Sequence, residues 1–396
     1  MKPAIVISGN PNALGVARSL AGEGVPVVVV HYAAHDMAHC SRVVAQSVKA
    51  PRPDEFEAGF IDCIRSLSAR YGGGVLMPTS DEALVAVSRH KQTLAADFVV
   101  ACPDWTVVER CIEKPQTYAL AEKHHVPSPR TVVPRSLEDV DSYGRSVEYP
   151  CLLKPSQGHL FTARFGTKMF VAASYEQLIR QYRQAQDAGL EVMLQEIIPG
   201  EDSRVVNYNA YCWEGKVLAE FTAVHVRNAP PRFGSPRVVV SRAIPEVLES
   251  GRKILEVLGY CGFACTEFKQ DPRDGVYKLM EVNARHNLST LLAVRSGINF
   301  PFIEYRHRLD GVIPEAPSFR KEVYWIDLVR DIGYSVRHFG REEQSLAEYL
   351  SPYLREHVDA ILDIRDLRPF LKRIAFLLGK GLHVMRIGAA GKGSVG

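Results

Sequence analysis

The chain has 396 residues, of which 46% are hydrophobic and 23% charged, and its formal net charge is +3. These values are ordinary for a globular protein of two or three domains, and so small a net charge gives no compositional case for nucleic-acid binding. No apolar run reaches membrane-spanning length and no signal peptide opens the chain, so we expect a cytoplasmic protein. None of the eight cysteines forms a Cys-x-x-Cys pair, which favours buried thiols over disulfides or zinc ligands.

The first 110 residues alternate between strand and helix patterns. Apolar strands are predicted over 4–7, 25–32, 74–78 and 98–102, and helices over 13–23, 56–70 and 81–95. This alternation predicts a doubly wound parallel α/β domain. The loop after the first strand lacks the G-x-G-x-x-G pattern, so it gives little support for dinucleotide binding.

The middle of the chain changes pattern after residue 110. Predicted elements are a helix over 111–130, a strand over 149–155, a loop over 156–168, a helix over 175–188 and a strand followed by a turn over 192–202. A hairpin of strands over 205–213 and 216–226 and a helix over 245–259 come next. The strand over 149–155 is apolar but carries Lys154 near its end. A lysine in such a setting needs a compensating charge, and a phosphate would supply one.

Residues 262–289 hold the most informative pattern. Strands over 263–269 and 276–282 flank a tight turn, and because strand side chains alternate faces, Glu281 and Asn283 lie on one side. Hairpin pairing brings Glu267 to the same face. Two carboxylates and an amide oxygen suit Mg²⁺, with Arg285 beside it to hold a phosphate or carboxylate. An ordinary surface hairpin with solvated acids is the alternative.

The string E-F-K-x-D…G…L-M-E-V-N-A-R resembles the magnesium signature of the ATP-grasp superfamily. The resemblance implies that Glu267, Glu281 and Asn283 hold Mg²⁺ (or Mn²⁺) against the phosphates of ATP. It also implies that Arg285 contacts a phosphate or the acyl intermediate.

The same resemblance implies further nucleotide contacts. Lys114 and Lys154 match the two phosphate-binding lysines, and Lys168 or Arg164 would act from a lid formed by residues 156–168. Backbone groups of Glu196 and Ile198 would read adenine. Asp202, with Glu201 as the competing residue, would bind the ribose. Arg227, in preference to Arg232, would lie near the transferred phosphate or the substrate carboxylate. Asn10 and Asp81 are candidate substrate contacts from the first domain.

The expected architecture is an N-terminal doubly wound parallel α/β domain (1–110) followed by a two-lobed ATP-grasp fold. Residues 111–190 would form its small lobe and residues 191–320 its metal and catalytic lobe. Residues 321–396 form an extension without an assignable motif, although 323–327 reads as a strand and 345–354 as a helix. Its basic, apolar segment 368–380 is read as a docking helix in preference to a membrane-surface contact.

The resemblance to ATP-grasp carboxylate–amine ligases, including those similar to D-aspartate ligase, implies an ADP-forming enzyme. It would activate a small-molecule carboxylate as an acyl phosphate and join it to an amine, with amino acids or peptides as candidate substrates. ATP and Mg²⁺ are the expected cofactors, and a homodimer is compatible with the sequence. The alternatives are a carboxylase or carboxylate kinase with the same nucleotide site, and a non-catalytic nucleotide-binding protein.

Overall fold

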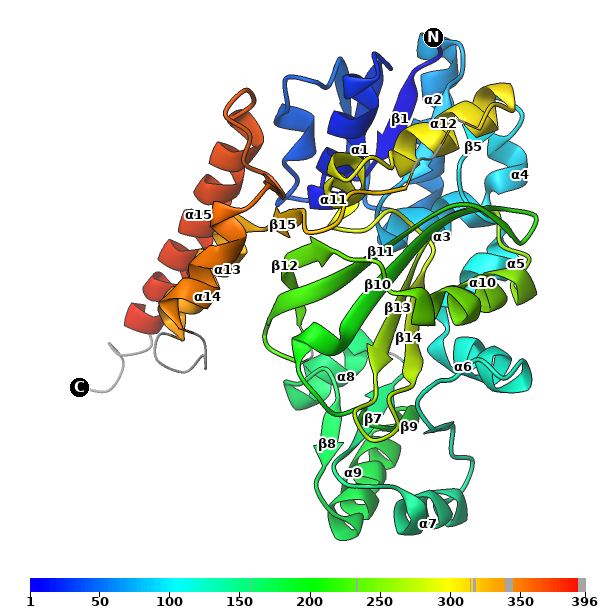
Figure 1. The fold of residues 1–396 in the computed structure, drawn as a ribbon, viewed down its shortest axis with the longest axis vertical. Helices are drawn as coiled ribbons and strands as arrows, with labels where there is room; N and C mark the ends of the chain where they lie inside the picture. The colour runs from blue at the N-terminus through cyan, green and yellow to red at the C-terminus, as the bar shows by residue number, and fades with distance from the viewer. Residues whose placement is uncertain (157, 233, 314, 316–317, 339–344, 391–396) are drawn as a thin grey trace.

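The computed structural model describes residues 1–396 except 157, 233, 314, 316–317, 339–344 and 391–396. Within the described residues, the strands form a five-stranded, a four-stranded and a seven-stranded sheet. Figure 1 shows the seven-stranded sheet at the centre, the five-stranded sheet at one end of the long axis, and the four-stranded sheet at the other. The expected mixture of parallel and antiparallel α/β structure is therefore present.

The five-stranded sheet is wholly parallel, with strand order β3-β2-β1-β4-β5. Its inner strands β1 and β4 are completely buried, as their apolar sequences predict for a sheet covered on both faces. Strand β3 was not predicted, because it is a polar, mostly exposed edge strand. The elements are β1 (Ala4–Ile7), α1 (Pro11–Gly22), β2 (Val27–His31), η1 (Ala38–Cys40), β3 (Gln46–Lys49), α2 (Glu57–Tyr71), β4 (Val75–Pro78), α3 (Asp81–Arg89), α4 (Lys91–Leu94) and β5 (Val99–Val100).

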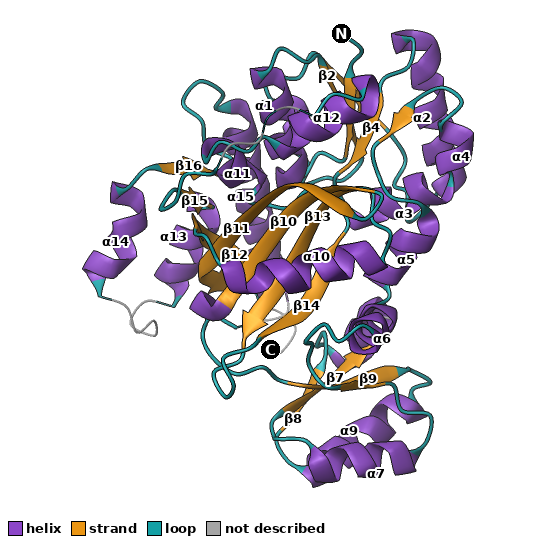
Figure 2. Cartoon of the chain, turned by 45° about the vertical axis from the view of Figure 1, so that its right-hand side comes forward, coloured by secondary structure: helices purple, strands orange, loops and turns teal. Residues whose placement is uncertain are grey.

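The four-stranded sheet is antiparallel, with order β6-β9-β7-β8, and helices α7 and α9 pack together beside it (Figure 2). The single helix expected over 111–130 is divided in two, because Pro115 has no backbone N–H with which to continue α5. The segment expected as a loop contains helix α8. The elements are α5 (Trp105–Ile112), α6 (Lys114–Lys123), β6 (Thr131–Val132), α7 (Leu137–Ser146), β7 (Cys151–Pro155), α8 (Gly158–Phe165), β8 (Phe170–Ala172), α9 (Tyr175–Asp187) and β9 (Val192–Glu196).

The central sheet has the order β14-β13-β10-β11-β12-β15-β16 and is antiparallel except for the pair β15–β16. The hairpin β10–β11 turns at Glu214 and Gly215, whose φ angles of 50° and 76° are both positive, as a two-residue hairpin turn requires. Its elements up to residue 283 are η2 (Asp202–Arg204), β10 (Val205–Trp213), β11 (Lys216–Ala229), β12 (Ser235–Ser241), η3 (Pro245–Val247), α10 (Leu248–Val257), β13 (Gly262–Gln270) and β14 (Tyr277–Asn283).

The remaining helices attach the end of the chain to the rest. Figure 1 shows α13, α14 and α15 gathered along one side of the molecule. No described helix is both long and apolar enough to cross a membrane. The elements are α11 (Thr290–Arg295), α12 (Phe300–Asp310), β15 (Tyr324–Ile326), α13 (Leu328–Arg337), α14 (Leu346–Leu354), β16 (His357–Asp359) and α15 (Arg368–Ala390).

Candidate functional site

A cavity of about 840 Å³ is lined by residues from all three sheets and from the C-terminal helices. The parallel sheet contributes the loop after β1, the four-stranded sheet contributes β7 and β9, and the central sheet contributes β10 to β14. The structure thus brings together many of the predicted site residues. Those that line the cavity are Asn10, Lys114, Lys154, Lys168, Arg232, Glu267, Glu281, Asn283 and Arg285.

The hairpin β13–β14 has the predicted form and sets the two glutamates face to face. Glu267 pairs with Glu281 in the register, and Cys265 pairs with Asn283. The register shifts between Glu267 and Phe268, a bulge that keeps the two acidic side chains opposed. The Asn283 amide donates a hydrogen bond of 2.9 Å to Glu281 Oε1, so these side chains share one side of the hairpin.

The electrostatics of this pair favour a bound cation. Burial and the neighbouring Glu281 charge raise the pKa of Glu267. Burial also opposes ionisation of Glu281. The positive charge of Lys114, whose Nζ lies 3.2 Å from Glu281 Oε2, outweighs this effect of burial, so the pKa of Glu281 is lowered. The described residues contain no cluster of three or more His, Cys, Asp or Glu side chains able to hold a metal. Two carboxylates with one amide fit Mg²⁺ that completes its shell with water and phosphate oxygens.

Lys154 extends from β7 toward the same cavity. Its Nζ donates to Gln195 Oε1 at 2.6 Å, and Gln195 in turn donates to Thr131. Burial, reinforced by the nearby Lys114 charge, lowers the pKa of Lys154 to about 8. A polyanion in the cavity would reverse this shift, because it would favour the charged amine.

Arg285 joins the hairpin to the N-terminal sheet. Its Nε and Nη2 donate to the two carboxylate oxygens of Asp81 at 2.7 and 3.0 Å. Asn12, at the start of α1, donates to the carbonyl of His286 at 3.1 Å. The candidate Asp81 is thus engaged with Arg285, while Asn10 caps α1 by accepting from Ala13 and also lines the cavity.

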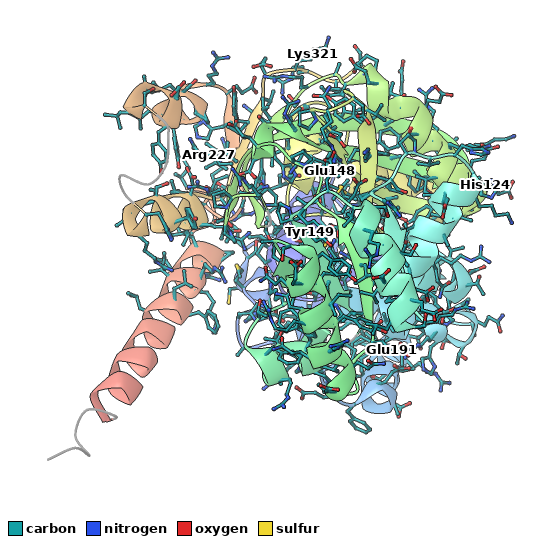
Figure 3. The ribbon with its side chains drawn as sticks, turned by 90° about the horizontal axis from the view of Figure 1, so that it is seen from below. His124, Glu148, Tyr149, Glu191, Arg227 and Lys321 are labelled. Carbon is teal, nitrogen blue, oxygen red and sulfur yellow. The ribbon has the colours of Figure 1, made fainter. Side chains whose placement is uncertain are left out.

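Arg227 occupies a different environment from the expected one. It is 2% exposed, is not among the residues that line the cavity, and donates to both carboxylate oxygens of Asp331 at 3.2 and 2.8 Å. Figure 3 shows Arg227 at the junction between the sheet and the C-terminal helices. Arg232 lies at the cavity instead. The expected preference for Arg227 over Arg232 as a substrate contact therefore needs correction.

The acidic candidates after β9 also lie outside the cavity lining. The Asp202 carboxylate accepts from the backbone N–H of Asn228 at 2.8 Å and of Arg232 at 2.7 Å, so it shapes the loop that presents Arg232. Glu201 is exposed. Because backbone donors already engage the Asp202 carboxylate, the expected ribose role has no structural support at this residue.

Glu196 and Ile198 do not line the cavity either. The Glu196 N–H donates to the Arg130 carbonyl at 3.0 Å, because β9 is an interior strand with β6 and β7 on its two sides. That amide is therefore unable to serve adenine without releasing its partner. Ile198 is buried, and its role in nucleotide binding remains a prediction.

The turn of the hairpin reaches across to the four-stranded sheet. Arg273 Nη2 lies 3.0 Å from Glu196 Oε2 on β9 and is held by Asp271, whose side chain is completely buried. Lys278 Nζ contacts Asp271 at 2.7 Å. Asp271 therefore fixes the two cations that join the hairpin β13–β14 to β9.

Asp271→Asn should lower the free energy of unfolding by about 2 kcal/mol at neutral pH, because charge-assisted hydrogen bonds are lost. Hydrogen bonds from Arg273 and then Lys278 lower the pKa of Asp271 in the folded state. Its contribution is thus present above the unfolded pKa of about 3.9 and disappears as pH falls through the folded value. Denaturation of the two proteins from pH 7 to pH 2 should show the difference shrinking at acid pH. Asp274→Asn, at an exposed position of the same turn, is the control, with a smaller expected change.

Several residues at the cavity carried no recognisable signal in the sequence. Asn207 lies opposite Glu267 on β10. His225 is buried on β11, and burial lowers its pKa to about 4, so it is neutral at pH 7. Arg330 and Arg373 come from α13 and α15. The strand pairing predicts Asn207 once β10 and β13 are known to be neighbours, whereas the arginines depend on how the C-terminal helices pack.

Comparisons with known proteins agree with this architecture. No protein-family model matches the chain. The chain is 27% identical over 312 residues to D-aspartate ligase of Enterococcus faecium (strain Aus0004), covering 74% of each sequence. Its structure is similar to L-amino acid ligase from Bacillus licheniformis, with 18% identity, a TM-score of 0.60 and coverage of 78% of this chain and 74% of that one. It is also similar to the biotin carboxylase domain of Hydrogenobacter thermophilus 2-oxoglutarate carboxylase in complex with MgADP and bicarbonate, with 16% identity, a TM-score of 0.62 and coverage of 81% and 73%. At these identities the two structural matches show a shared fold.

Proposed function

We propose that this chain, an ATP-grasp protein similar to D-aspartate ligase, is an ADP-forming ligase that joins a carboxylate to an amine. The observation that carries the proposal is the pairing of Glu267 with Glu281 on one hairpin, at a cavity that Lys114, Lys154 and Arg285 also line. A mutually repelling acidic pair surrounded by cations suits a metal–triphosphate complex.

Glu267, Glu281 and Asn283 would hold Mg²⁺, which supplies neutralisation of phosphate oxygens when bound. Lys114 and Lys154 would add fixed positive charge for the phosphates. The comparison with a domain solved with MgADP supports this choice of cofactor.

The chemistry follows from the weakness of a carboxylate as an electrophile. A substrate carboxylate oxygen attacks the γ-phosphorus of ATP, the bond to the β–γ bridging oxygen breaks, and ADP leaves. The amine nitrogen then attacks the carbonyl carbon of the acyl phosphate, inorganic phosphate leaves, and the nitrogen loses a proton. Such transfer depends on positioning and charge, so it requires no nucleophilic side chain.

Arg285 and Arg232 are the best placed side chains to orient the reacting carboxylate. Both line the cavity, and Arg285 is held in place by its two hydrogen bonds to Asp81. The names of the D-aspartate ligase and the L-amino acid ligase support amino acids as the substrate class.

A pairwise screen of amino acids, including D-aspartate, tests the proposal through ADP release and mass detection of the product. We expect ADP release that requires both partners and Mg²⁺ and stops with EDTA. ADP release with bicarbonate or with an acid alone would instead indicate a carboxylase or a carboxylate kinase. Binding of ATP without ADP release for any pair would indicate a non-catalytic nucleotide-binding protein.

A further inference from the structure

The C-terminal extension contributes two cations to the cavity. Arg330 on α13 and Arg373 on α15 both line it, although neither belongs to the motifs that suggested the ATP site. Arg232 and His35 also belong to this lining. The extension is therefore part of the site wall.

These two arginines have little compensating charge within the protein. Arg330 Nη1 is buried without a hydrogen-bond partner in the described part of the chain, and its Nε lies 3.8 Å from Asp327 Oδ2. Arg373 forms no hydrogen bond or ion pair with any described residue. Burial lowers the pKa of Arg373, and the Arg330 charge adds to this effect while Asp327 opposes it. The guanidinium groups of Arg330 and Arg373 thus share the nearby carboxylate of Asp327.

Two other cations of the cavity, Lys114 and Arg285, each have a carboxylate partner. Lys114 lies 3.2 Å from Glu281 Oε2, and Arg285 donates twice to Asp81. Arg330 and Arg373 are both half-buried, and a buried guanidinium N–H without an acceptor, such as Arg330 Nη1, is costly. The excess positive charge at Arg330 and Arg373 therefore points to an anionic ligand.

Both helices that carry these arginines are anchored. Asp331 ties α13 to Arg227 and Arg237 of the central sheet. Asp366, just before α15, lies 3.1 Å from Arg18 Nη2 and accepts from the N–H of Arg42 at 3.0 Å. The extension consequently presents its arginines from fixed positions, which reduces the ordering cost of binding.

We propose that Arg330 and Arg373 form a subsite for a second carboxylate of the acid substrate, one that does not react. This proposal rests on the ligase function above and deepens it, because it predicts a preference for dicarboxylates over monocarboxylates. Arginine suits the role, since its planar fork binds a carboxylate through two parallel hydrogen bonds.

Calorimetric titration with succinate and with butyrate tests the subsite, using the full chain saturated with Mg²⁺ and a non-hydrolysable ATP analogue. Succinate should bind at least about tenfold more tightly than butyrate. Arg330→Gln and Arg373→Gln should each weaken succinate binding by about tenfold or more, the loss expected for a charge-assisted hydrogen bond, without changing butyrate binding. Arg373→Lys keeps the positive charge but loses the planar guanidinium fork. Its affinity for succinate should therefore lie between that of the unaltered protein and that of Arg373→Gln.

Arg337→Gln, an exposed position on the same helix as Arg330, is the matched control and should leave both affinities unchanged. Circular dichroism checks that each variant is folded. No saturable succinate binding, equal binding of the two acids, or equal effects of Arg337→Gln and Arg330→Gln would overturn the subsite. Failure of the ATP analogue to bind would instead overturn the proposed function, so the two failures are distinguishable.

Discussion

Glu281→Gln should reduce ATP-dependent ligation by at least about 100-fold, because the substitution removes a charge that would hold the metal against the phosphates. Glutamine preserves the shape and can still accept from Asn283, whose amide lies 2.9 Å from Glu281 Oε1. It also leaves Lys114 without its carboxylate partner at 3.2 Å. The expected loss is therefore electrostatic, since the hairpin keeps its register.

The rate of ADP release with an active substrate pair measures this effect. A second readout is the electron paramagnetic resonance of Mn²⁺ with a non-hydrolysable ATP analogue, where the variant should bind Mn²⁺ more weakly. Glu249→Gln on the exposed face of α10 is the control and should match the unaltered protein in both measurements. Unchanged turnover and unchanged Mn²⁺ affinity in Glu281→Gln would contradict the metal site.

The hairpin could be predicted because its information is local. Alternation of side chains places Glu281 and Asn283 on one face, and the turn between 271 and 275 sets the approximate pairing. The bulge after Glu267 is not apparent in the sequence, yet it determines the final register. The parallel sheet was predictable for a similar reason, since its buried strands are short apolar runs separated by helices.

The predictions for Arg227 and Asp202 depended on contacts that are distant in sequence. In the sequence, Arg227 looks like a cation in a basic loop. In the structure it pairs with Asp331, 104 residues later, and lies outside the cavity lining. Asp202 looks like a free acid after a turn, but the loop of Asn228 and Arg232 binds it. Residue type alone indicates a charge, whereas only the tertiary structure shows which partner neutralises it.

The same argument applies to Glu196 and to the extension. Whether the Glu196 amide is available depends on which strand pairs with that side of β9, and β6 is a strand of two residues with a weak sequence signal. Arg330 and Arg373 lie 43 residues apart on helices without a recognised motif, and the ion pairs of Asp331 and Asp366 anchor those helices beside the cavity.

Asp331→Asn should cause the largest loss of stability among single substitutions in the extension. Its carboxylate is completely buried and accepts from Arg227 at 2.8 Å, from Arg237 at 3.0 Å and from the hydroxyl of Tyr353. Removing one partner of a buried ion pair costs about 3–5 kcal/mol, because the remaining charges stay out of water. Here one carboxylate serves two guanidinium groups, so its loss removes a buried counter-charge from both of them.

Thermal and urea denaturation measure this loss of stability. Because a chain with several sheets can unfold locally, hydrogen exchange is needed to show which elements are destabilised. Faster exchange should appear in α13 and in the adjoining strands β11 and β12, while the parallel sheet keeps its protection. Asp310→Asn removes the carboxylate of an exposed pair with Arg306 and should cost less than about 1 kcal/mol. Equal effects of the two substitutions would show that the Asp331 pairs do not hold the extension to the sheet. A selective loss would mean that the position of Arg330 at the cavity depends on the buried charge of the next residue along α13.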